Sequence, residues 1–225
     1  MAKRKCIIKE KQDRDNDVFI LHGHGMKRGS PFPIVSKFFL NQNYNLFACD
    51  IETKKDDDWV EVLNEYEKMI RERIKKGKHV NLVGESMGGT LALSLGEKIP
   101  EVKKVFAIGA VHGKEMLVGI SKDRQEYLED QFNKKYEEIN IPRIIGAFPD
   151  NFEICKASNK NKYYLIHSQA DKLVTFDQFI ENKKELCLPD ENTLVYDTPK
   201  DEKSWWAHVM PGRNWKTIEF IEKNL

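Results

Sequence analysis

Short apolar runs alternate with amphipathic stretches along most of this chain, and this alternation limits the possible folds more than any other feature. We expect strands in six apolar runs, which are Val18–Leu21, Asn45–Cys49, Val80–Val83, Val102–Ile108, Tyr163–Ile166 and Thr193–Tyr196. Between Trp59 and Ile74 the apolar residues recur at helical spacing instead. The pattern predicts an α/β fold, with a mostly parallel sheet of about six strands and helices on both faces.

Length and composition are consistent with a single domain. The chain has 225 residues, of which 40% are hydrophobic and 32% charged, so it can form a sizeable core. We therefore expect residues 1–225 to form one domain. The stretch 110–160 is more polar and interrupts the alternation, although its middle has apolar residues at helical spacing. We interpret it as a small helical insertion, either a cap over the end of the sheet or a surface helix packed on the core.

Charge and cysteine content argue against several classes of function. The 37 basic and 36 acidic residues leave a net charge of +1, so the balance indicates neither a nucleic acid nor an anionic membrane as partner. After the basic start, Cys6–Ile8 is too short for the core of a signal peptide or for a membrane span. The four scattered cysteines form no C-x-x-C pair. We therefore expect a cytoplasmic protein with reduced thiols.

The strongest motif is the G-x-S-x-G pattern of residues 84–88, Gly-Glu-Ser-Met-Gly. It directly follows the strand expected at Val80–Val83 and begins an Ala- and Leu-rich helix that we expect to run to about Ile99. A serine on such a sharp turn projects from the sheet, and the flanking glycines let strand and helix pack closely. The helix N-terminus also favours developing negative charge. The pattern predicts Ser86 as a nucleophile; the alternative is a glycine-rich connection without chemistry.

A serine hydroxyl needs a base to take its proton and an acid to orient that base. Asp171 follows the fifth expected strand, and His208 lies between the last strand and a final helix expected at Arg213–Lys223. We therefore predict Asp171 as the acid and His208 as the base. The alternative acid is Asp50, which also follows a strand but precedes Ser86 in the chain. The histidines that compete for the base role are His22, His24, His79, His112 and His167.

The run His22-Gly23-His24-Gly25 follows the first expected strand. Glycines there allow the backbone to approach a substrate oxygen, so the amides of His24 and Met87 are predicted to form an oxyanion hole. Two histidines at this spacing can also bind a metal, but no Asp or His nearby completes a set of ligands. We expect neither a metal nor a cofactor.

Apolar side chains adjoin the predicted base and begin the insertion. Trp206 lies two residues before His208, and Met116 and Leu117 follow the fourth strand. They are candidates to line an apolar acyl pocket, because ligand pockets are mostly apolar. The alternative is that they cover the core.

Together, these motifs resemble the α/β-hydrolase superfamily from about Val18 to Leu225. Size and limited insertion make the chain similar to compact bacterial esterases and monoacylglycerol-lipase-like carboxylesterases. Trp59 and Phe152–Ile154 are also similar to the retinoblastoma-binding type of serine hydrolase. The resemblance implies the fold, the Ser-His-Asp triad and hydrolysis of an ester, thioester or amide. The chain departs from it where relatives often have glycine (Ala207) and proline (Thr175).

The function predicted from the sequence is a carboxylesterase-like serine hydrolase that forms an acyl-enzyme on small, apolar acyl esters. Two alternatives remain open. A thioesterase or acyltransferase would use the same residues on another acyl donor or acceptor. A non-catalytic ligand- or protein-binding member would use only the fold.

Overall fold

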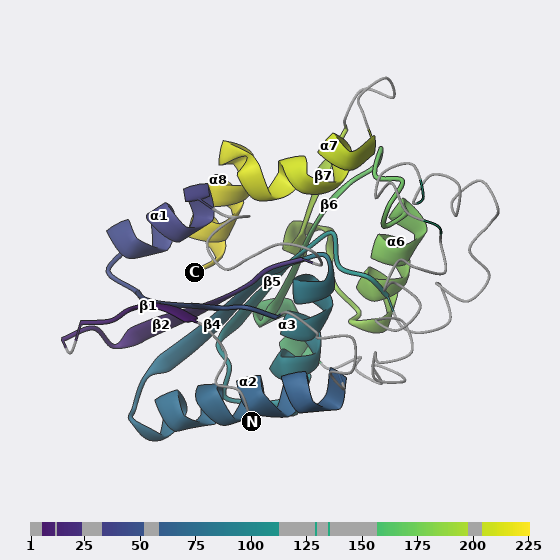
Figure 1. The fold of residues 1–225 in the computed structure, drawn as a ribbon. Coiled ribbons are helices and arrows are strands. Elements are labelled where there is room, and N and C mark those ends of the chain that lie inside the picture. Colours follow the sequence, from purple (N-terminus) through teal and green to yellow (C-terminus); the bar gives the residue numbers. More distant parts are fainter. Residues whose placement is uncertain are drawn as a thin grey trace.

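The computed structural model describes residues 6–11, 13–23, 33–51, 59–112, 129, 135, 157–197 and 204–225. These residues form one sheet of seven strands in the order β1-β3-β2-β4-β5-β6-β7 (Figure 1). The strands are β1 (Cys6–Lys9), β2 (Asn16–Leu21), β3 (Asn45–Cys49), β4 (His79–Glu85), β5 (Lys104–Ile108), β6 (Tyr163–Ser168) and β7 (Thr193–Tyr196). β1 runs antiparallel to β3, and every other neighbouring pair is parallel. The predicted α/β class with a mostly parallel sheet is confirmed.

Helices cover both faces of the sheet (Figure 1). They are α1 (Pro33–Asn41), α2 (Trp59–Lys75), α3 (Met87–Lys98), α6 (Phe176–Glu185), α7 (Ser204–Val209) and α8 (Trp215–Asn224), with short 3₁₀ turns η2 (Ala157–Asn161), η3 (Asp190–Asn192) and η4 (Met210–Arg213). Alternate residues of a strand point to opposite faces, so Phe19 packs with the α2, α3 and α6 layer and Val18 with the α1 and α8 layer. Both are fully buried, which explains why β2 reads as a continuous apolar run.

The first strand, β1, was not predicted from the sequence. It is only four residues long, and its residues are half-buried or exposed. Its position is set by pairing with β3, in which Cys6 lies opposite Cys49 and Lys9 opposite Leu46. An edge strand of this kind carries little apolar signal of its own.

The prediction of reduced thiols is wrong. Cys6 and Cys49, which face each other across the β1–β3 pair, form a disulfide. Cys187 is disulfide-bonded as well. Cys6 and Cys49, 43 positions apart in the sequence, are therefore brought together by strand pairing. Because disulfides persist mainly in oxidising compartments, the cysteine argument for a cytoplasmic location no longer holds.

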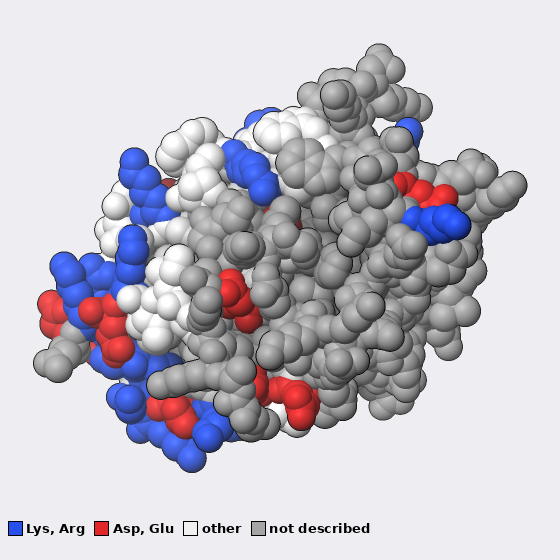
Figure 2. Space-filling view, in the orientation of Figure 1, with Lys and Arg blue, Asp and Glu red and all other residues white. Residues whose placement is uncertain are grey.

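A charge cluster in which Asp17 and Arg73 are buried joins α2 to the sheet at the amino ends of the parallel strands. Arg73 of α2 donates from Nε to Asp17 Oδ2 at 2.5 Å and from Nη1 to Glu10 Oε1 at 2.6 Å. Asn45 Nδ2 also donates to Asp17 Oδ1, at 2.8 Å. In the part of the surface described in Figure 2, basic and acidic side chains lie beside one another near α2. They do not form a patch of one sign there.

The predicted insertion at 110–160 lies almost wholly outside the described residues. Within the ranges that are described, no helix has the length and apolar character needed to cross a bilayer.

The disulfide leads to a prediction about stability. Cys6→Ser opens a covalent loop with a sequence separation of 43 residues, so the free energy of unfolding should fall by about 2–4 kcal/mol. Urea unfolding without reductant measures the loss. Ile8→Ser, at an exposed position of the same strand, is the control and should change stability much less. Equal small losses in the two variants would show that the β1–β3 bond does not stabilise the fold.

Candidate active site

Ser86 occupies a sharp turn between β4 and α3. Its φ of 54° and ψ of −121° lie in a region that residues with a side chain rarely adopt. The turn is held from both sides, because Ser86 N donates to Ile108 O at 2.7 Å and Ser86 O accepts from Thr90 N at 3.1 Å. The serine is half-buried, while the residues on either side of it are buried.

The two glycines of the motif are required by close backbone contacts. A Cβ on Gly84 would lie 2.0 Å from Gly88 O, and a Cβ on Gly88 would lie 2.2 Å from Leu21 O. No side chain can occupy either position without displacing the backbone. The glycines therefore let α3 begin directly against β4 and β2.

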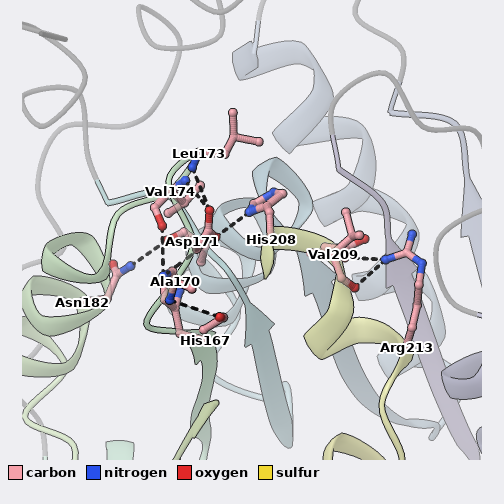
Figure 3. Close-up of polar contacts among 12 residues, drawn as sticks. His167, Ala170, Asp171, Leu173, Val174, Asn182, His208, Val209 and Arg213 are labelled. Atoms are coloured by element: carbon pink, nitrogen blue, oxygen red, sulfur yellow. Dashed lines mark hydrogen bonds and ion pairs between the residues drawn. The ribbon is translucent and has the colours of Figure 1, made fainter. Parts of the chain in front are cut away.

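Asp171 lies in the loop that follows β6, with 4% of its surface exposed. One carboxylate oxygen, Oδ1, accepts from the backbone amides of Leu173 at 2.8 Å and Val174 at 3.0 Å. The other, Oδ2, lies 2.6 Å from His208 Nδ1 (Figure 3). The backbone thus fixes the carboxylate and directs its second oxygen at the imidazole.

His208 lies in the short helix α7, between the last strand and the final helix. Its Nδ1 faces the Asp171 carboxylate, which can only accept, so Nδ1 carries the proton and Nε2 of the neutral ring is an acceptor. Burial lowers the pKa of His208, but Asp171 and, more weakly, Glu85 raise it, and the net pKa lies above the ordinary value. This arrangement suits a proton acceptor near neutral pH.

The serine turn and the Asp171–His208 pair meet at the carboxyl end of β5. Ser86 N is bonded to Ile108 O, and the next residue is Gly109. A Cβ on Gly109 would lie 3.4 Å from His208 Cε1 and 3.8 Å from Asp171 Oδ2. The three predicted residues thus come from separate segments and gather around one strand end.

None of the other histidines that the structure describes hydrogen-bonds the Asp171 carboxylate in place of His208. His167 Nε2 lies 3.0 Å from Val174 O and 3.9 Å from Asp171 Oδ2. Burial lowers its pKa, with Asp171 opposing, so the ring is neutral and supports the Asp171 loop. His112 pairs with Glu185 of α6 at 2.9 Å, and His79 is exposed at the start of β4.

His22 follows β2, and both of its ring nitrogens are used by the backbone. Nε2 accepts from Ile51 N at 2.8 Å, so Nδ1 carries the proton and donates to Gly23 O at 2.8 Å. This bonding leaves neither nitrogen for a metal. Across the described ranges, no group of three or more His, Cys, Asp or Glu side chains is placed to hold a metal ion.

Several predicted residues fall outside the described ranges, namely His24, Met116 and Leu117. Met87 is the first residue of α3, so its amide is at the helix N-terminus beside Ser86. Trp206 is on α7, with 40% of its surface exposed. Asp50 is half-buried at the end of β3, and the carboxylate that bonds His208 is that of Asp171.

Glu85 and Arg213 were not predicted from the sequence. Glu85 is completely buried, and its Oε1 accepts from Arg213 Nη1 at 3.2 Å. Burial raises the pKa of Glu85 to about 7, against the opposing effects of Arg213 and His208. A charged residue between a buried strand and the serine was a visible signal for Glu85. Nothing near Arg213 in the sequence indicated its partner.

This architecture is the α/β-hydrolase fold. A lipase-esterase related protein from Clostridium acetobutylicum matches over 100% of both chains, with a TM-score of 0.66 and 18% identity. An esterase of Pyrococcus furiosus matches over 98% of this chain and 91% of its own, with a TM-score of 0.59 and 18% identity. A structure from a study of carboxylesterases of Nitrososphaera gargenis covers 98% and 94%, with a TM-score of 0.65 and 10% identity. No protein-family model and no curated protein matches the sequence.

The contact between α3 and β2 generates a prediction. Gly88→Ala places a carbon against the Leu21 and His22 carbonyl oxygens and should reduce the free energy of unfolding by at least about 3 kcal/mol. Gly77→Ala is the control for the close contact, because Gly77 has a positive φ but nothing within 4 Å of an added Cβ. It should cost only about 1–2 kcal/mol. Urea unfolding curves of both variants make the comparison, and similar losses would contradict the close contact.

Proposed function

We propose that this protein is a serine hydrolase that cleaves carboxylic esters with Ser86, His208 and Asp171. The observation that carries the proposal is the strained serine turn facing the same strand end as the 2.6 Å His208–Asp171 contact. A binding protein would have no need to hold a serine at positive φ beside an oriented imidazole. The esterases among proteins of the same fold support this class of reaction.

In the proposed mechanism, Ser86 Oγ attacks the acyl carbonyl carbon while His208 Nε2 takes the hydroxyl proton. Asp171 keeps the other ring nitrogen protonated and stabilises the imidazolium. His208 then gives its proton to the alkoxide as the alcohol leaves, which produces an acyl-enzyme. A water that loses its proton to His208 attacks this ester and releases the acid, returning the proton to Ser86.

The negative charge on the carbonyl oxygen needs donors. The amide of Met87, at the N-terminus of α3, is one proposed donor, and the helix dipole adds to it. The amide of His24 is the proposed second donor. None of these steps requires a cofactor.

We propose small, apolar acyl esters as substrates. Trp206 presents an exposed aromatic surface on the helix that carries His208, and Met116 and Leu117 are the other proposed contacts. A panel of p-nitrophenyl esters of graded acyl length, with the matching thioesters, identifies the acyl group and distinguishes an esterase from a thioesterase.

Removal of the nucleophile tests the mechanism. Ser86→Ala should lower kcat for p-nitrophenyl acetate by roughly 10⁴–10⁶ and abolish labelling by a fluorophosphonate probe. Ser94→Ala is the control, because Ser94 is a buried serine within α3, the helix that begins after Ser86, and its hydroxyl donates to Thr90 O. It should keep both activities. Near-normal turnover by folded Ser86→Ala would overturn the serine mechanism, and a folded wild type without labelling would favour a binding protein.

The acid is tested by comparing two aspartates. Asp171→Asn keeps the shape of the side chain but cannot stabilise the imidazolium, so kcat should fall by roughly 10⁴. Asp50→Asn, at the end of β3, should reduce kcat far less. Both rates are measured with one ester, after thermal unfolding curves have shown that the two variants are equally stable. Loss of activity in Asp50→Asn with an active Asp171→Asn would reverse the assignment of the acid.

A further inference from the structure

One guanidinium connects the neighbours of two proposed catalytic residues. Arg213 Nη1 donates to Glu85 Oε1 at 3.2 Å and to Val209 O at 2.6 Å. Glu85 directly precedes Ser86, and Val209 directly follows His208. Figure 3 shows Arg213 reaching back to Val209 beside the Asp171–His208 pair. Arg213 therefore links the serine turn to the C-terminal end of α7, the helix that carries His208.

This connection is partly buried. Glu85 has no exposed surface, and the Arg213 side chain is 21% exposed. The second oxygen of Glu85, Oε2, is buried and has no hydrogen-bond partner within the described ranges. A buried carboxylate that lacks part of its hydrogen bonding is costly, and such costs are typical of functional sites.

We propose that Glu85 and Arg213 are positioning residues: Arg213 clamps the α7 end onto the serine turn, and Glu85 is a second carboxylate that acts on His208 in addition to Asp171. This inference rests on the proposed function, since it assigns roles toward the same base. It adds two residues to the triad and separates their effects. Arg213 acts on distance, and Glu85 acts on charge.

The charges that act on His208 come from several elements. Asp171 after β6 and Glu85 of β4 stabilise the imidazolium, whereas Arg213 of η4 opposes it. His167 of β6 is neutral and is coupled to the same pair. Loss of the Glu85 charge removes one attractive partner, so the pKa of His208 must fall. Burial raises the pKa of Glu85 to about 7, so Glu85 titrates near neutral pH, and the His208 titration in the wild type should show this step in addition to its own.

Glu85→Gln tests the electrostatic role. The amide oxygen can still accept from Arg213, so the clamp remains while the charge is lost. The imidazole Cε1 proton of His208, followed by NMR, should titrate in one step with a lower midpoint than in the wild type. The pH profile of kcat/KM should shift the same way, with little change in its alkaline plateau. Glu10→Gln, in the Arg73 cluster at the opposite ends of the strands, is the charge-matched control. Identical His208 titrations in all three proteins would refute the role of Glu85.

Arg213→Gln tests the clamp. It should lower kcat by about 10–100-fold at all pH values with a KM change of only a few-fold, because misplacement of the base acts on the reacting geometry. Arg213→Lys should restore part of the rate. Since Arg213→Gln leaves Glu85 buried without its partner, the double variant Glu85→Gln/Arg213→Gln provides a folded test and should show the same loss of kcat. A folded double variant with wild-type kcat would refute the clamp.

An NMR measurement that needs no substrate tests the roles of Glu85 and Arg213 independently of the proposed function. The Nδ1 proton of His208, held between two buried side chains, should give a slowly exchanging downfield resonance in the wild type and in Glu10→Gln. It should be broadened or lost in the double variant. If the wild type cleaves no ester but these resonances behave as stated, the proposed function fails while the roles of Glu85 and Arg213 stand. An unchanged resonance in the double variant overturns the clamp even in an active esterase.

Discussion

At Gly88 the backbone of α3 lies so close to β2 that an added carbon would be 2.2 Å from the Leu21 carbonyl oxygen. This contact fixes where α3 begins, and the start of α3 fixes the strained conformation of Ser86. The same turn is bonded to Ile108 at the end of β5, and the next residue, Gly109, lies against the His208 ring. The position of Ser86 thus follows from how closely one helix can approach one strand.

The Asp171 carboxylate is oriented mainly by the backbone rather than by other side chains. Two backbone amides hold one oxygen of its carboxylate, which leaves the other with a single direction. His167 supports the same loop through Val174 O. The imidazole of His208 is therefore oriented by main-chain geometry, which changes little when surface residues change.

The sequence allowed the sheet and the serine turn to be predicted because both have local signals. Parallel strands such as β2 are buried on both faces and read as continuous apolar runs, and the elbow motif lies directly between a strand and a helix. β1, the Cys6–Cys49 bond and the Glu85–Arg213 pair lack such signals. They depend on strand register or on contacts between residues 128 positions apart, which only tertiary packing brings together. The order of residues along the chain, with Asp171 after Ser86 and before His208, allowed these two to be predicted, but not Arg213.

The covalent bond between β1 and β3 also bears on aggregation of the protein with other copies of itself. β3 is buried along its whole length, so its outer edge would offer a row of unpaired amides and carbonyls next to apolar side chains if β1 were absent. β1 occupies that edge, although its few half-exposed residues hold it weakly by packing alone. The disulfide keeps this short strand attached during local opening. It therefore protects against edge-to-edge aggregation. Reduction of the disulfide would make the molecule more prone to aggregate before it unfolds.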